Sequence, residues 1–532
     1  MPRTELLSSQ PRHSPLADRS CFTPGGLASL AQEPRLALYL LARSEDRALG
    51  AVTAEEQESA HRVTGVLPPL YPEWLGSPEF CDSFGLRFPY LAGEMANGIS
   101  TTRMVKAMAG SGMLGFFGAG GLDFAAVERG VAQLLHTLGA GGSWGVNLIH
   151  SPQEPELERK VGDLLVRTGV PCVSASAFME LTPSVVLCSA AGLRADPSGE
   201  IVRARHVIAK VSRLEVAEQF MAPAPGDLLD QLLREGRLSE EEAVLASHIP
   251  VASAVTAEGD SGGHTDNRPL LVLLPALIAL RGEVAVRHGL ARPPYVGAAG
   301  GLGTPQAVAA AFALGAAYVV TGSVNQMAVE SGLSAAAKAL LFRAGLADTA
   351  MAPASDMFEL GVTLQVLRTG TMFAPRATRL YEAYRAHASL EALPQDLRAQ
   401  LEREVFGLSL AAVWEETRVF WERRDPEQLE RAERDPRHRM ALVFRWYLGR
   451  SSGWAISGDP ARRLDYQIWC GPAAGGFNQW VRGSFLARPE ECSVVQIGLN
   501  LMEGAAVVTR AQQIRQSGRA VASPDLTPRL LG

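Results

Sequence analysis

Proton transfer is the chemistry best served by His264, which stands in the run Glu258-Gly259-Asp260-Ser261-Gly262-Gly263-His264-Thr265-Asp266. An imidazole can donate a proton near neutral pH. The paired glycines Gly262 and Gly263 allow a ligand to approach the backbone closely. Asp260 and Asp266 are near enough in sequence to orient the ring or to bias its charge. We therefore interpret His264 as a functional acid, with a structural histidine as the alternative.

Two glycine-containing turns are suited to an anion. The first is Ala299-Gly300-Gly301, between an apolar run and a helical window, and the second is Gly322-Ser323, directly after the next apolar run. Free backbone N–H groups at such turns bind phosphate. The third glycine of a dinucleotide fingerprint is absent, and no acidic residue ends the following run. Two successive turns of this kind are typical of the phosphate site of a (β/α)8 barrel, whereas plain connecting turns are the alternative.

Two further polar residues stand in apolar strand patterns. Asn147 follows Gly145-Val146, and its amide could either meet a ligand or bond to nearby loop backbone. Lys210 interrupts the apolar run 207–211, and a buried lysine needs an anionic partner. An electron-rich ring of a bound ligand and a neighbouring carboxylate both fit that requirement.

These residues can form one site only in a fold that brings the ends of their strands together. Apolar, β-branched runs alternate with Ala/Leu-rich helical windows, which indicates parallel βαβ units. Thr304 before Pro305, and Ser239 with Glu242, are typical helix starts. The eight predicted strands lie near 90–93, 113–117, 145–148, 172–174, 206–211, 251–257, 295–298 and 317–321.

The predicted fold is therefore an α/β (β/α)8 TIM barrel with an additional, mostly α-helical C-terminal domain. We assign residues 1–70 to a lead-in rich in turn formers and residues 71–372 to the barrel. Residues 373–532 form a helical substrate or lid domain, in which the window 500–516 could return to the barrel as an outer helix.

The composition argues against several classes of protein. The 532 residues carry 50 Lys and Arg against 56 Asp and Glu, a net charge of −6, which argues against a nucleic-acid partner. The six scattered cysteines form no Cys-x-x-Cys pair, so no metal site or disulfide framework is indicated and a reducing compartment is favoured. The longest apolar run, 270–280, is too short to span a bilayer. We expect a cytoplasmic protein without a membrane partner.

Several long stretches carry a family resemblance. The guide is Asp260 to Leu270 (DSGGHTDNRPL), and further matches include VSASAFM at 173–179, VVTGSVNQ at 319–326, MAPASDMFE at 351–359 and DYQIWCGP at 465–472. Over about residues 65–515 the chain resembles the PfaD family, the trans-acting enoyl reductases of polyunsaturated fatty-acid and polyketide synthases. This family is similar to the flavin barrels of nitronate monooxygenases and FMN-dependent enoyl-acyl-carrier-protein reductases.

The resemblance implies the members of a flavin site. The FMN phosphate would lie on the turn residues Ala299, Gly300, Gly301, Gly322 and Ser323, with Gly262 and Gly263 close by. Gly93-Glu94-Met95-Ala96 aligns with the first-strand segment that touches the ring, where the wider group carries Ala-Pro-Met, so Glu94 departs from that pattern. Asn147 matches the third-strand asparagine near the flavin. For Lys210, the pyrimidine end of a reduced flavin ring and a neighbouring carboxylate stay open as alternative partners. His264 matches the histidine beside the reacting carbon.

The implied reaction is reduction of an enoyl thioester on an acyl carrier protein. FMN and NADPH would supply the hydride for the β-carbon, and His264 is the candidate acid for the α-carbon. A nitronate monooxygenase-like oxidase is the alternative enzyme, and a flavin-free scaffold protein is an alternative of another class. The sequence leaves a homodimer open.

Overall fold

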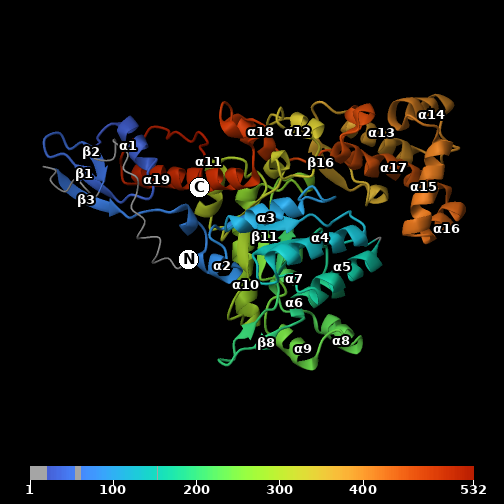
Figure 1. Cartoon of the computed structure of the whole chain (residues 1–532), viewed down its shortest axis with the longest axis horizontal. Coiled ribbons are helices and arrows are strands. Elements are labelled where there is room, and N and C mark those ends of the chain that lie inside the picture. Colours follow the sequence, from blue (N-terminus) through green and yellow to red (C-terminus); the bar gives the residue numbers. More distant parts are fainter. Residues whose placement is uncertain (1–20, 54–60, 153) are drawn as a thin grey trace.

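Eight parallel strands close into a barrel at the centre of the molecule (Figure 1). The structure, a computed structural model, describes residues 21–53, 61–152 and 154–532; residues 1–20 and 54–60 of the expected lead-in lie outside this range. Each barrel strand pairs with the next along the chain, and β14 pairs with β4 to close the ring. The strands are β4 (Tyr90–Ala92), β5 (Leu114–Phe117), β6 (Trp144–Ile149), β7 (Cys172–Ser176), β10 (His206–Val211), β11 (Ala254–Glu258), β13 (Tyr295–Ala299) and β14 (Val319–Thr321). The predicted (β/α)8 barrel is confirmed, with all eight strands at their expected places.

Helices cover the outside of the barrel because its strands are buried on both faces and need an apolar outer layer. Thr304 caps α11 (Pro305–Ala313) through its hydroxyl, and Ser239 and Glu242 form the expected reciprocal cap of α9 (Glu240–Ala246). The helices between barrel strands are α3 (Thr102–Gly110), α4 (Phe124–Leu138), α5 (Pro155–Arg167), α6 (Pro183–Ala190), α7 (Leu214–Met221), α8 (Gly226–Arg234), α9 (Glu240–Ala246), α10 (Leu270–His288) and α11 (Pro305–Ala313). A two-stranded ribbon, β8 (Arg194–Ala195) with β9 (Ile201–Val202), and α2 (Pro78–Phe84) complete this part.

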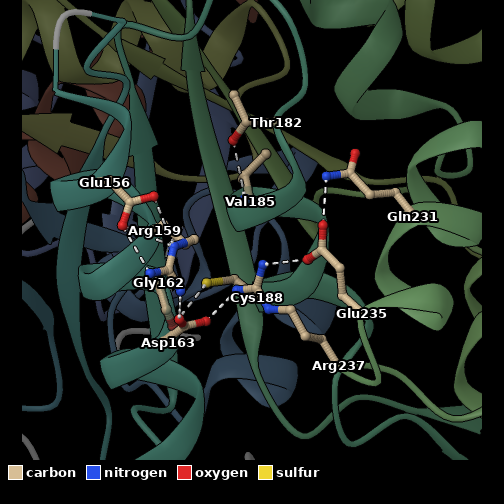
Figure 2. Close-up of polar contacts among 10 residues, drawn as sticks. All are labelled: Glu156, Arg159, Gly162, Asp163, Thr182, Val185, Cys188, Gln231, Glu235 and Arg237. Atoms are coloured by element: carbon tan, nitrogen blue, oxygen red, sulfur yellow. Dashed lines mark hydrogen bonds and ion pairs between the residues drawn. The ribbon is translucent and has the colours of Figure 1, made fainter.

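Polar contacts join three of the outer helices (Figure 2). Asp163 of α5 accepts from Arg159 and from Arg237, which follows α8 and also pairs with Glu235. Cys188 of α6 is buried, and burial raises the pKa of its thiol to about 11. The thiol therefore stays protonated at neutral pH.

A long insertion separates β14 from the last barrel helix, α19 (Val494–Gln516), which packs against α11 and α3. The insertion is mostly helical, as expected, and its core is aromatic, with Phe358, Phe406, Phe444 and Tyr447 buried together. Its elements are η3 (Ser323–Met327), α12 (Ala335–Leu341), β15 (Thr349–Pro353), η4 (Phe358–Leu360), β16 (Thr363–Leu367), α13 (Phe373–Ala386), α14 (Gln395–Leu401), η5 (Glu402–Phe406), α15 (Leu410–Arg424), α16 (Glu427–Arg434), α17 (Pro436–Ser457), η6 (Pro460–Asp465), α18 (Ala473–Trp480) and η7 (Phe485–Ala487).

A second small sheet forms beside the barrel. The strands β15 and β16 lie within the range 71–372, yet they pair with each other and with β12 (Gly263–His264) rather than with the barrel strands. This sheet joins the loop after β11 to the insertion, and it brings residues near 356 to the loop that contains His264.

The N-terminal segment, where no strand was predicted, holds a helix and a three-stranded antiparallel sheet. These are α1 (Pro24–Ala31), β1 (Leu38–Ala42), β2 (Leu49–Thr53) and β3 (Arg62–Leu67), followed by η2 (Pro72–Trp74). Their apolar side chains pack on Ala511 and Ile514 of α19, and fully buried Arg510 donates to the carbonyls of Pro34 and Pro68. In Figure 1 this sheet and helices α13–α17 lie at opposite ends of the molecule, with the barrel between them. Across the described ranges, no helix is both long and apolar enough to pass through a bilayer.

Candidate active site

Two open turns lie side by side where β13 and β14 end. Ala299 is paired with Val320, so Gly301 and Gly322 follow neighbouring strand ends. A Cβ placed on Gly301 or Gly322 would meet no atom within 4 Å, and Gly301 has a φ of +72°. Neither residue's backbone N–H donates a hydrogen bond within the described part of the chain. Free N–H groups facing open space fit a phosphate.

The residues beside the two open glycines contact other segments of the protein. Ala299 accepts a hydrogen bond from the Gly259 N–H at 2.9 Å, and a Cβ on Gly300 would lie 2.7 Å from the Gly259 carbonyl carbon. The Ser323 hydroxyl accepts from the Gly471 N–H at 3.0 Å, which leaves its own proton available for a ligand. The two open glycines are therefore framed by the loop after β11 on one side and by the insertion on the other.

At the paired glycines before His264, the backbone of the insertion packs closely against the loop after β11. A Cβ on Gly262 would lie 2.6 Å from Cys470 Cα, and one on Gly471 would lie 3.0 Å from the Ser261 carbonyl carbon. Gly263 has a φ of +83° and pairs with Gln365 of β16. The close approach that Gly262 permits is thus taken up by protein backbone in this structure.

His264 contacts a carboxylate from the insertion. Its Nε2 lies 3.1 Å from Asp356 Oδ1, and both side chains are partly exposed. Burial acts to lower the pKa of His264, but the hydrogen bond and charge of Asp356 outweigh it and raise the pKa above its usual value.

The carboxylates nearest to His264 in sequence have other partners. Asp260 accepts from Gln365 Nε2 at 2.6 Å and from Asn267 Nδ2 at 3.1 Å. Asp266 accepts from Ser212 and Arg213, whose hydrogen bond is the main reason that the pKa of Asp266 falls to about 2. The expectation that Asp260 or Asp266 orients the imidazole is therefore wrong, because both are held by groups on other elements.

Three charged side chains meet at the carboxyl ends of β4, β10 and β11. Lys210 Nζ lies 3.2 Å from Glu94 Oε1 and 3.0 Å from Glu258 Oε1. Burial acts to lower the pKa of Lys210, but the two carboxylates raise it above its usual value, so the lysine is charged at all physiological pH values. The interpretation of Lys210 as the partner of neighbouring carboxylates thus holds in this structure. Both oxygens of Glu94 are buried, and among the described residues Oε1 has the ion pair with Lys210 while Oε2 has no partner.

The segment after β4 closes the same end of the barrel. Gly93 donates to the Thr321 carbonyl at 2.9 Å, beside the turn at Gly322. Met95 is buried, and its carbonyl accepts from Ser100, while the Ala96 carbonyl accepts from Ile99. This turn directs Glu94 towards Lys210, so the residue that departs from the wider group's pattern is the one that forms the ion pair.

Asn147 is buried at the end of β6. Its Nδ2 donates to the Ser174 carbonyl at 3.2 Å and to Ser176 Oγ at 2.7 Å, and a Cβ on Gly120 would lie 2.9 Å from its Oδ1. The alternative in which Asn147 bonds to nearby protein groups therefore holds for its nitrogen. A small hollow on its other side is lined by Gly120, Ile149, Leu157 and Arg424, among others.

Sequence reasoning missed three contributors to this end of the barrel. Asp356 stands in a stretch that carried the family resemblance and Glu258 begins the run that contains His264, but no pattern within those stretches assigned either residue a partner. The segment from Trp469 to Gly471 covers Gly262 and bonds to Ser323 and Gln326. Its only signal was the stretch 465–472 itself.

Comparison with known proteins gives matches over the barrel and the insertion. Residues 387–466 match the family model described as [acyl-carrier-protein] S-malonyltransferase, inserted helical domain. The chain is 43% identical over 489 residues to a polyunsaturated fatty acid synthase protein of Thraustochytrium sp., covering 91% of this chain and 32% of that protein. It is 42% identical over 458 residues to the polyketide biosynthesis protein PksE of Bacillus subtilis, covering 86% and 59% respectively.

A solved structure is similar over almost its whole length. The enoyl reductase domain of MlnA, from the macrolactin biosynthesis cluster of Bacillus amyloliquefaciens, is 34% identical with a TM-score of 0.79. The match covers 84% of this chain and 99% of that domain. By contrast, the chain spans less than two thirds of the length of the curated relatives that it matches.

Proposed function

Because this chain belongs to the PfaD family of enoyl reductases from polyketide and polyunsaturated fatty-acid synthases, we propose that it reduces the α,β double bond of enoyl thioesters. The proposed carrier of the thioester is an acyl carrier protein, the cofactor is FMN and the reductant is NADPH, with the enzyme acting in trans on its synthase. The match of residues 387–466 to a helical domain of an acyl-carrier-protein transferase supports that choice of partner.

The observation that carries the proposal is an open glycine cradle at the same end of the barrel as an imidazole. Gly300 touches the backbone of Asp260, so the cradle adjoins the loop that carries His264. The free N–H groups of Gly301 and Gly322 and the hydroxyl of Ser323 would hold the FMN phosphate. When bound there, FMN would supply hydride transfer between NADPH and the alkene.

His264 is the proposed proton donor to the α-carbon. Its Nε2 is engaged by Asp356, whereas its Nδ1 has no hydrogen-bond partner among the residues that the structure describes. In the doubly protonated ring, Nδ1–H is therefore the group free to donate. The raised pKa of His264 keeps more of the ring protonated at neutral pH, as a general acid requires.

The charged trio at the barrel mouth has a separate role. Lys210 is held between Glu94 and Glu258, so it is neutralised by protein groups before any ligand binds. We assign the trio to shaping the floor of the site, where the buried Glu94 Oε2 is an acceptor for an N–H donor of the ligand.

The test is the absorbance spectrum of the purified protein with FMN, recorded before and after anaerobic NADPH and then after an enoyl thioester on a carrier protein. Bleaching by NADPH and recovery on adding the thioester are expected. Oxygen uptake with a nitroalkane, without enoyl reduction, would instead indicate the oxidase. Protein that stays colourless with added FMN would indicate a scaffold.

The role of His264 is tested by His264→Ala. We expect unchanged FMN binding and a loss of enoyl reduction of about 100-fold or more, the usual contribution of a general acid. The matched control is His248→Ala, at an exposed position just after α9, which should turn over like the wild type. Undiminished turnover by the His264 variant would rule out the role.

A further inference from the structure

The carboxylate beside His264 comes from a distant part of the chain. Asp356 follows β15 and precedes η4, in the insertion that separates β14 from α19. Its Oδ1 lies 3.1 Å from His264 Nε2 and also accepts the Met357 N–H at 3.1 Å. The backbone hydrogen bond fixes the carboxylate on its own turn, so the imidazole meets an oxygen whose position is already set.

The turn that carries Asp356 is anchored in the core of the helical unit. Phe358 is fully buried, and its ring lies 5.2 Å from that of Tyr384, 5.5 Å from that of Tyr381 and 6.4 Å from that of Phe444. A fully buried phenylalanine is among the side chains whose loss destabilises a protein most, because its truncation leaves a large cavity. The aromatic core therefore holds the backbone two residues from Asp356.

A second anchor is electrostatic. Glu359 Oε1 lies 3.5 Å from Arg445 Nη1 and 3.9 Å from His438 Nδ1, both on α17. Arg445 and His438 are largely buried, and His438 Nε2 is held by Gln428 at 3.0 Å. Two residues of the long helix α17 thus hold Glu359, which follows Phe358. The turn therefore has little freedom to move away from His264.

Among the described residues, the carboxylates that lie near His264 in sequence are engaged by other side chains. Asp260 and Asp266 are engaged by Gln365 and Arg213, and Glu258 is engaged by Lys210. The charged groups that act on His264 are Asp356 and, less strongly, Glu258. Asp356 is therefore the group that can orient the imidazole through a direct hydrogen bond.

We infer that Asp356 is a positioning residue for His264, through which the helical insertion holds the proton donor of the barrel in place. The inference rests on the proposed function for its catalytic consequence. With Nε2 held by Asp356, the ring presents Nδ1 to the site, and the carboxylate favours the protonated ring. The insertion is thus part of the active site as well as a cover for it.

The experiment compares the wild type with Asp356→Asn and Asp356→Glu. Asparagine keeps the shape but removes the charge, so kcat should fall about tenfold with little change in KM, a part of the full effect of the acid. Because Asp356 favours the protonated ring, activity that falls as pH rises should fall about one pH unit earlier in Asp356→Asn. Asp356→Glu should recover part of the rate.

A second measurement does not depend on turnover. In ¹⁵N-histidine-labelled protein, the titration of the His264 ring, assigned by its loss in His264→Ala, should move to lower pH in Asp356→Asn. Asp266→Asn is the matched control, since its carboxylate lies two residues from His264 without contacting the ring, and it should leave the titration in place. Equal titration in the wild type and Asp356→Asn overturns the inference. A wild type that reduces no enoyl thioester overturns the proposed function, and the titration still decides the inference.

Discussion

Replacing Lys210 by methionine tests the charged trio most directly. The change removes the cation that lies 3.2 Å from Glu94 and 3.0 Å from Glu258, and it keeps most of the side-chain volume. The three side chains are 16%, 5% and 19% exposed, so two mostly buried carboxylates would lose their counter-charge. Breaking a buried ion pair by removing one partner costs about 3–5 kcal/mol. Because Glu258 keeps some contact with solvent, we expect a loss of about 3 kcal/mol at the lower end of that range.

The assay is urea unfolding followed by circular dichroism at pH 7.5. Adding Glu94→Gln should recover a substantial part of the loss, since one buried charge then replaces two. Lys160→Met, at an exposed position of α5, is the matched control and should change stability by less than about 0.5 kcal/mol. A loss below about 1 kcal/mol, or no recovery on adding Glu94→Gln, would refute the reasoning.

Three further substitutions test an open glycine, a closely packed glycine and a buried arginine. Gly322→Ala should leave the melting temperature within about 1 °C of the wild type, because its Cβ meets nothing within 4 Å, yet weaken FMN binding at least tenfold under the proposed function; unchanged FMN affinity would argue against the cradle. Gly262→Ala should lower the melting temperature by several degrees, since its Cβ would lie 2.6 Å from Cys470 Cα, and an unchanged value would mean that the insertion yields easily. Arg510→Met should cost about 2–3 kcal/mol in urea unfolding, because the buried guanidinium's charged hydrogen bonds to the carbonyls of Pro34 and Pro68 are lost, and a neutral result would show that the N-terminal sheet does not depend on them.

The barrel could be predicted from local pattern alone. Each barrel strand is a short apolar run, as in Val207-Ile208-Ala209, because both of its faces are buried. Repetition of strand and helix then leaves few topologies, since parallel crossovers have a fixed hand. The same logic predicts that Gly301 and Gly322 follow neighbouring strand ends. Their open surroundings were not predictable, because Gly300 is also a glycine and yet is packed against the loop after β11.

The N-terminal sheet shows why other parts were not predicted. Its strands are edged by charged and turn-forming residues, and β3 is largely exposed. Their order comes from packing on Ala511 and Ile514 of α19, more than 400 residues along the chain. No window around these strands contains that information.

For the functional residues, too, some features follow from the local sequence and others only from the tertiary structure. The types and spacing of residues within single segments determined the glycine turns, the place of His264 in the loop after β11, and the need of Lys210 for an anionic partner. Which anion each residue meets was decided only in three dimensions: Glu94 and Glu258 for Lys210, and Asp356 rather than Asp260 or Asp266 for His264. The reason is that hydrophobic periodicity reports which way a side chain faces along its own element, whereas a hydrogen bond or ion pair depends on where two separate elements come to rest.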